Sequence, residues 1–175
     1  MHRSSRATDD RRKKLTETIC YLLTRTDLPS LGRGKAGAHA HHAGSHLTWT
    51  LVVEPLLEGR EVPEDVLEWH RQGGGFGTCA AVGGAGQLPL SRLEAVLSAA
   101  TALGQRSGLV VDRTYPHLVD EEVFGLLDKT KFTEEPKRIR GGVIFFREEA
   151  TCGWVLGDKK ELEIVLRQFD LVPND

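Results

Sequence analysis

The chain of 175 residues has little cysteine and few aromatic side chains: it contains three cysteines, and Phe, Trp and Tyr together make up 6%. The cysteines are odd in number and far apart, and no Cys-x-x-Cys pair is present, which argues against a secreted disulfide framework and a zinc ribbon. Behind the basic N-terminus, the apolar run Ile19 to Leu23 is much shorter than the about 7–15 residues of a signal peptide or the about 20 of a membrane span. We therefore expect a soluble, cytoplasmic protein that does not interact with membranes.

The remaining composition is that of an ordinary globular protein. Hydrophobic residues make up 39% and charged residues 27%, which excludes a wholly disordered chain, a collagen-like chain and a coiled-coil rod. A chain of this length buries enough surface to fold as one domain. We expect a flexible basic tail over residues 1–7 and a single globular domain over residues 8–175.

The net charge of -2 hides an uneven distribution. Residues 1–35 contain nine Lys and Arg against four Asp and Glu, whereas residues 36–127 contain five against eleven. The basic head offers a nucleic-acid or anion-binding segment at Arg11, Arg12, Lys13 and Lys14. Few aromatic residues are interleaved there to stack on bases, so the alternative is a solvated helix start that faces the acidic middle.

Apolar spacing and capping residues predict alternating helices and strands. The predicted helices begin at Thr8, Pro63, Ser91, Asp120 and Asp158, and the first of them ends before Pro29. The predicted strands are 47–53, 76–82, 109–111, 143–146 and 152–156, with the last two joined in a hairpin. Residues 32–46 and 128–142 are predicted to be loops, the first exposed and mobile because it is rich in Gly, Ala and His and has almost no large side chain to bury.

This order of elements predicts the fold class. Helix–strand alternation in the middle of the chain is typical of βαβ crossovers and parallel pairing, and a terminal hairpin adds antiparallel pairing. We therefore expect an α+β or α/β domain with a mixed sheet of four to five strands and about five helices packed on it.

Four histidines lie within eight residues: His39, His41, His42 and His46. Neutral imidazole is a common metal donor, and three such rings could hold Zn²⁺ or Ni²⁺. Functional sites hold their ligands on rigid elements with further hydrogen-bonding partners, whereas these histidines stand among glycines and alanines. We predict no cofactor and expect at most adventitious binding of zinc or nickel.

Gly73 and Gly75 begin a glycine-rich segment. Glycine lets backbone N–H groups approach a phosphate closely, which makes these residues candidates for ligand binding. The dinucleotide-binding motif, however, needs a strand before the glycines and a helix after them. Here a predicted helix comes first, so the alternative is a helix stop followed by a loop.

Acidic residues follow two of the predicted strands. Glu54 comes after the first strand and Asp112 after the third, and ligands of open α/β sheets collect at the carboxyl ends of strands. His117 lies close to Asp112 in the sequence, and Arg113 and Tyr115 offer a cation and a hydroxyl to an anionic substrate. If the protein is an enzyme, the candidate catalytic residues are Asp112, Glu54 and His117, with Arg113 and Tyr115 as ligand-binding residues.

The leading functional hypothesis is a non-catalytic binding or regulatory domain that docks a protein partner, because no complete catalytic set stands out. The alternatives are a small enzyme acting on a phosphorylated or acyl substrate at the strand-end acids, and a nucleic-acid-binding protein that uses the basic head. A deep pocket holding Asp112 would favour the enzyme, an apolar patch the partner, and a continuous basic stripe the nucleic acid. The oligomeric state is left open.

Overall fold

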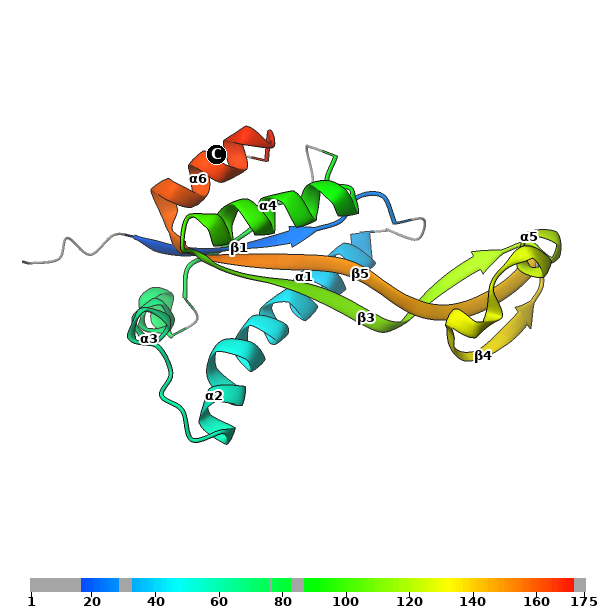
Figure 1. Ribbon diagram of the computed structural model, residues 1–175, viewed down its shortest axis with the longest axis horizontal. Helices are drawn as coiled ribbons and strands as arrows, with labels where there is room; N and C mark the ends of the chain where they lie inside the picture. The colour runs from blue at the N-terminus through cyan, green and yellow to red at the C-terminus, as the bar shows by residue number, and fades with distance from the viewer. Residues whose placement is uncertain (1–16, 29–32, 76, 83–86, 172–175) are drawn as a thin grey trace, which may run out of the picture.

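A mixed five-stranded sheet organises the computed structural model, which describes residues 17–28, 33–75, 77–82 and 87–171 (Figure 1). The strands are β1 (Thr18–Thr24), β2 (Cys79–Val82), β3 (Arg106–Val119), β4 (Phe132–Ile139) and β5 (Gly142–Asp158). The helices are α1 (Arg33–Thr48), which continues through the π-helix η1 (Trp49–Val53) into α2 (Glu54–Leu57), and α3 (Glu64–Arg71), α4 (Leu90–Ala102), α5 (Glu121–Leu126) and α6 (Lys159–Gln168). The chain also contains two short 3₁₀ turns, η2 (Gln72–Gly74) and η3 (Lys129–Lys131).

The strand order is β2-β1-β5-β3, and β4 pairs with β5 beyond the end of β1. β1 is parallel to β2 and antiparallel to β5, and β5 is also antiparallel to β3 and β4. With α1, η1 and α2 counted as one continuous helix, five helices accompany the sheet in the described residues. The predicted mixed sheet is therefore confirmed.

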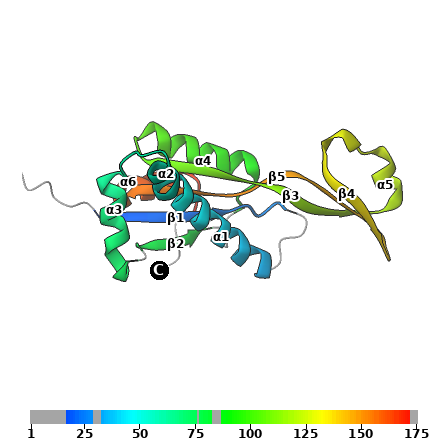
Figure 2. The same ribbon diagram turned by 90° about the horizontal axis from the view of Figure 1, so that it is seen from below.

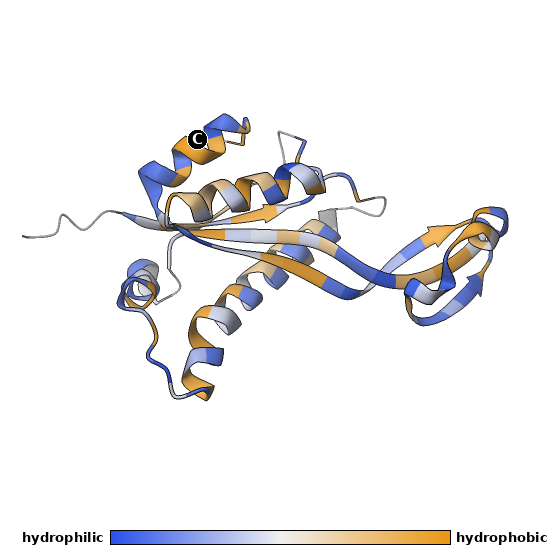
Figure 3. Ribbon diagram, viewed as in Figure 1, coloured by the Kyte–Doolittle hydropathy of each residue, from blue (hydrophilic) through white to orange (hydrophobic). Residues whose placement is uncertain are grey.

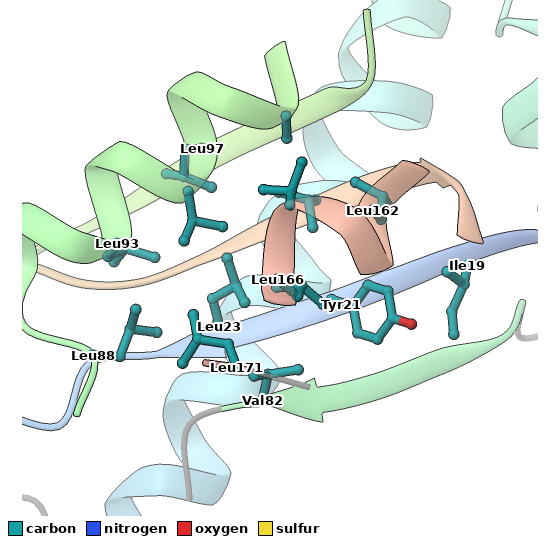
Figure 4. Packing of buried hydrophobic residues seen from close by; sticks show 14 residues of the cluster. Ile19, Tyr21, Leu23, Val82, Leu88, Leu93, Leu97, Leu162, Leu166 and Leu171 are labelled. Carbon is teal, nitrogen blue, oxygen red and sulfur yellow. The ribbon is translucent and has the colours of Figure 1, made fainter. Parts of the chain in front are cut away.

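Both faces of the sheet are covered by helices (Figures 1 and 2). Ile19, Tyr21 and Leu23 of β1 point toward α4 and α6, where they pack with leucines of both helices (Figure 4). Cys20, between them in the strand, faces the opposite side and packs with residues of α1 and α3. The core thus lies in two layers, one on each face of the sheet, as the period of two along a strand requires.

Two strands run far past this core. β3 has 14 residues and β5 has 17, against seven in β1 and four in β2. Their outer halves, with β4 and α5, form a projection that we call the arm (Figure 1). Phe124, Val143 and Phe145 form a small core of the arm between α5 and the sheet.

The structure corrects the helix predicted to begin at Thr8. Its apolar residues 19–23 form β1, because a strand buried on both faces is a continuous apolar run and satisfies helical spacing as well. The start of that predicted helix lies outside the described residues.

The predicted mobile loop at 32–46 is also wrong over the described residues, which form α1. Every fourth residue there is buried: His39, Ala43, Leu47 and Leu51. Small residues let the helix lie close to the sheet, so the lack of large side chains did not indicate a loop. The helix continues through 47–53, where alternation of apolar and hydroxyl residues had predicted a strand.

Two further predictions fail on the arm. Residues 132–139, expected in a charged loop, form β4, and the predicted hairpin at 148–151 is instead the middle of the single strand β5. The helices α3, α4 and α6, the strand β2 and the caps Asp120 and Asp158 are confirmed. The capping box expected at Ser91 is absent, because α4 begins at Leu90 with Pro89 as its N-cap and no side-chain cap.

None of the helices in the described ranges is both long and apolar enough to span a lipid bilayer.

Candidate functional site

Asp112 lies in β3 where the arm leaves the core. The pairing of β3 with β5 is irregular on both sides of it, between Val110 and Val111 and between Asp112 and Tyr115. The carboxylate of Asp112 accepts a hydrogen bond from the backbone N–H of Thr114 at 2.9 Å. Asp112 therefore stabilises a bulge in the strand and does not stand at a strand end, as the sequence had suggested.

His117 lies next to this bulge, between charged groups of β5. Its Nε2 accepts a hydrogen bond from Nε of Arg147 at 3.3 Å and lies 3.6 Å from a carboxylate oxygen of Glu149. The ring stacks on Phe145 and meets Tyr115 edge-on, each with 5.1 Å between ring centres. Burial, with the nearby Arg147 cation, lowers the pKa of His117, so the neutral imidazole is favoured.

A buried arginine fixes the other side of this region. Arg25 is 6% exposed, and its guanidinium donates to both carboxylate oxygens of Asp27 and, at 2.6 Å, to Glu149. It also donates to the carbonyl oxygen of Ala150. These bonds tie the chain after β1 to β5, and they hold the pKa of Asp27 below its usual range.

His39 approaches from α1. Its ring centre lies 6.0 Å from that of Tyr115, and its backbone carbonyl accepts a hydrogen bond from the thiol of Cys152 at 3.1 Å. Nδ1 of His39 is buried and has no hydrogen-bond partner within the described ranges. Burial is the main reason that the pKa of His39 is lowered, and the charges of His42 and Lys35 act in the same direction.

We call the set Arg25, His39, Tyr115, His117 and Glu149 the arm-root cluster. The structure brings three of the predicted residues into it, Tyr115, His117 and, from the histidine group, His39, and Asp112 is near enough to His39 to act on its pKa. Glu149 and Arg25 were missed, because each comes from a distant part of the chain and had no motif around it.

The other predicted site residues lie elsewhere. Glu54 begins α2, at the end of the long helix that points away from the arm (Figure 1). Arg113 is exposed on the bulge. Gly73 and Gly75 form the turn after α3, where Gly75 has φ +96°, and the chain then enters β2 rather than a helix. The basic residues 11–14 lie outside the described residues, so their role stays a prediction.

The four histidines of α1 are placed differently from one another. His39 is buried, whereas His41 and His42 are exposed. Nδ1 of His46 accepts a hydrogen bond from the indole of Trp154 at 3.0 Å. Over the part of the chain that the structure describes, no three His, Cys, Asp or Glu side chains are arranged to hold a metal ion.

Two cavities lie away from the arm-root cluster. One, of about 460 Å³, lies between α1, α3 and the sheet, and its lining includes Cys20 and Cys79. The other, of about 630 Å³, lies on the α5 side of the arm and is lined by Phe124, Phe132 and polar residues. Neither is lined by Asp112 or His117.

The side of the arm opposite α5 is apolar and uncovered. The strand pairings place seven side chains on this side, which we call the open face: Pro116 and Leu118 of β3, Glu134, Lys137 and Ile139 of β4, and Ile144 and Phe146 of β5. Leu118 is 61% exposed and Ile139 46%. In the arm, hydrophobic segments lie along β3 and β5, whereas β4 is mostly hydrophilic (Figure 3). This surface was not predicted, because it depends on β4, which lies within residues 128–142 that were expected to form a loop.

The position of α5 supports this assignment of faces. Arg138, next to Lys137 in β4, points to the other side and forms an ion pair with Glu121 of α5 at 2.8 Å. Phe132 and Phe145 stack at 4.9 Å beneath α5. The Lys137 ammonium lies 5.2 Å from the ring centre of Phe146, on the open face.

Comparison of the chain with protein-family models and with curated proteins gives no match.

Proposed function

We propose that the protein is a non-catalytic binding or regulatory domain that docks a protein partner through the open face of the arm. The observation that carries this proposal is the pairing of a projecting sheet with an uncovered apolar surface. Apolar side chains gathered on one exposed surface are typical of interaction sites, whereas single ones are ordinary. The arm holds this surface away from the core, where a partner can reach it.

The open face contributes little to folding of the chain itself. The arm already has a core on its other side, made by Phe124, Val143 and Phe145. Leu118 is 61% exposed and Ile139 46%, so in the free chain a large part of their apolar surface stays in contact with water. A partner that covers these side chains would remove their apolar surface from water, which favours binding.

The chemistry of the open face indicates the kind of partner. Its centre is aliphatic and aromatic, and its two charged side chains are Lys137, which lies over Phe146, and Glu134, which is opposite Phe146 in the strand pairing. A matching protein surface is apolar, with a carboxylate opposite Lys137 and a polar or basic group opposite Glu134, because a charge that is covered needs a partner.

The arm-root cluster supports an enzyme less well. Arg25, His39 and Tyr115 are 6%, 3% and 2% exposed, so little of these side chains is open to a substrate. Networks of buried ion pairs perturb pKa values without catalysis. We assign the cluster to holding the arm on the core, and the enzyme remains an alternative prediction.

The test compares two exposed leucines of the arm. Leu118 belongs to the open face, whereas Leu126 lies on α5 and is 83% exposed. A photoreactive amino acid at either position would capture neighbouring proteins in the native host. The affinity of the captured partner is then measured for the wild type and for Leu118→Asp and Leu126→Asp.

We expect capture from position 118 and a loss of affinity of about fivefold or more in Leu118→Asp, since truncating or charging a central apolar contact costs more than about 1 kcal/mol. Leu126→Asp should bind as the wild type does, and both variants should keep the wild-type melting temperature. Equal binding by all three chains would contradict the proposal. Self-association that Leu118→Asp abolishes would identify a second copy as the occupant and overturn a different partner.

A further inference from the structure

The cavity of about 460 Å³ on the core contains two cysteines side by side. Cys20 lies in β1 and Cys79 in β2, and the two are directly opposite each other in the parallel pairing. Residues opposite each other point to the same face, here toward α1 and α3. Trp49, Trp69, His41 and His70 also line this cavity.

The backbone spacing suits a disulfide. Neighbouring strands lie about 4.8 Å apart, and disulfides form across Cα separations of about 4.4–6.8 Å. The two thiols line the same cavity, and each acts on the pKa of the other. Bond formation would therefore need a rotation of the side chains and little movement of the strands.

The position of Cys79 is fixed by the residues before it. The carbonyl oxygen of Thr78 accepts two hydrogen bonds, from the backbone N–H of Cys20 at 2.9 Å and from the indole of Trp69 at 3.0 Å. Gly77 has φ +71° and lies against the Trp69 ring, where a Cβ atom would be 2.3 Å from Cε2. The pairing of β1 with β2 and the hydrogen bond from the Trp69 indole together keep Cys79 opposite Cys20.

The two thiols differ in access and acidity. Cys20 is fully buried, whereas Cys79 is exposed at the cavity. The hydrogen bond from Cys20 lowers the pKa of Cys79 to about 7, and the same bond, with burial, raises the pKa of Cys20. The attacking group in thiol–disulfide exchange is a thiolate that can reach its target, and Cys79 meets both conditions.

We propose that Cys79 and Cys20 form a thiol–disulfide exchange site that reduces a small organic disulfide bound in this cavity. The Cys79 thiolate attacks one sulfur of the disulfide R–S–S–R, which gives a mixed disulfide on Cys79 and releases R–S⁻. Cys20 then loses its proton and attacks the Cys79 sulfur, which releases the second R–S⁻. The two cysteines are oxidised to one disulfide, and R–S–S–R is reduced to two thiols once the released thiolates take up protons.

The cavity fits this order of events. Trp49 is 53% exposed at its edge and offers an apolar surface to the organic group. No small disulfide can reach Cys20 before Cys79, because Cys20 is covered. Cys20 can still attack Cys79 across the strand pair, since the two side chains are adjacent.

The test exposes the reduced full chain to glutathione disulfide, then stops the reaction with acid, blocks free thiols and maps the modified peptides by mass spectrometry. The wild type should pass through a glutathione adduct on Cys79 to a Cys20–Cys79 disulfide. Cys20→Ser and Cys20→Ala should stop at the adduct, and Cys79→Ser should not react. Cys152→Ser is the matched control, because Cys152 is buried in the same layer of the core and its thiol donates a hydrogen bond to the backbone carbonyl of His39. This variant should behave as the wild type does.

The pH dependence gives a second measurement. The rate at which iodoacetamide modifies Cys79 should rise through about pH 7 in the wild type, and through a higher pH in Cys20→Ala, which lacks the hydrogen-bond donor. A wild type that keeps glutathione on Cys79 without forming the internal disulfide would overturn the proposal. So would reaction of Cys79→Ser at the wild-type rate, or loss of the adduct in both Cys20 variants while circular dichroism shows them folded.

Discussion

Two arginines of this chain make the same kind of contact at different depths, and replacing each by methionine tests what the buried one contributes. Nε and a terminal nitrogen of Arg25 donate to the two oxygens of Asp27, and Arg106 does the same to Asp65. The side chain of Arg25 is 8% exposed and that of Arg106 36%. Methionine keeps most of the aliphatic stem and removes the charge.

Arg25→Met should lower the free energy of unfolding by about 3 kcal/mol, the lower end of the range for breaking a buried ion pair. The lower end applies for two reasons. Asp27 is 39% exposed and can be hydrated, and Glu149 still forms its ion pair with Arg147 at 3.1 Å in the variant. Arg106→Met should cost about 0–1 kcal/mol, as exposed ion pairs do.

The assay is urea unfolding followed by circular dichroism, with the change in midpoint compared at constant slope. The stabilisation by Arg25 depends on pH through Asp27, because the pKa of Asp27 is lowered in the folded chain, chiefly by the hydrogen bond from Arg25. The stabilisation is complete above the unfolded pKa of about 3.9 and is lost as the pH falls through the lower folded pKa. The difference between wild type and Arg25→Met should therefore narrow below about pH 4. An Arg25→Met variant as stable as Arg106→Met would refute this reasoning.

Two further predictions concern a helix cap and a buried histidine. The carboxylate of Asp158 accepts hydrogen bonds from the backbone N–H groups of Lys160 and Glu161, so Asp158→Ala should cost about 1 kcal/mol in thermal melts, and Asp158→Asn less; equal losses would contradict a capping role. The pKa of His39 is lowered in the folded chain, mainly by burial, so the unfolded chain takes up a proton first and stability falls as the pH drops below about 6.5. His39→Gln should lose less stability than the wild type between about pH 8 and pH 5.5, and identical pH dependences would show that the ring is not desolvated.

The sequence by itself determined the elements that depend on local contacts. α3, α4 and α6 follow from apolar residues at helical spacing, and Asp120 and Asp158 cap helices through bonds to residues two and three positions later. Such contacts need no other part of the chain. The mixed sheet was predicted from an order of elements that was only partly right, because residues 19–23, expected in a helix, form β1 and make the parallel pair with β2.

Only the tertiary structure decided the elements whose pattern suits two conformations. Residues 19–23 fit a helix by spacing, and they form a strand because the sheet is covered on both faces. α1 fits no apolar pattern, and its helix is stable because small residues such as Ala43 pack against the sheet. β4 became a strand because β5 extends far enough to pair with it.

The sites divide in the same way. Asp112, Tyr115 and His117 could be grouped from the sequence because they are neighbours on one strand. Glu149 and His39 join them only through pairing of β5 with β3 and packing of α1. The thiol pair of Cys20 and Cys79 depends on the parallel register of β1 and β2, which brings together residues far apart in the chain, and no local pattern of side chains encodes that register.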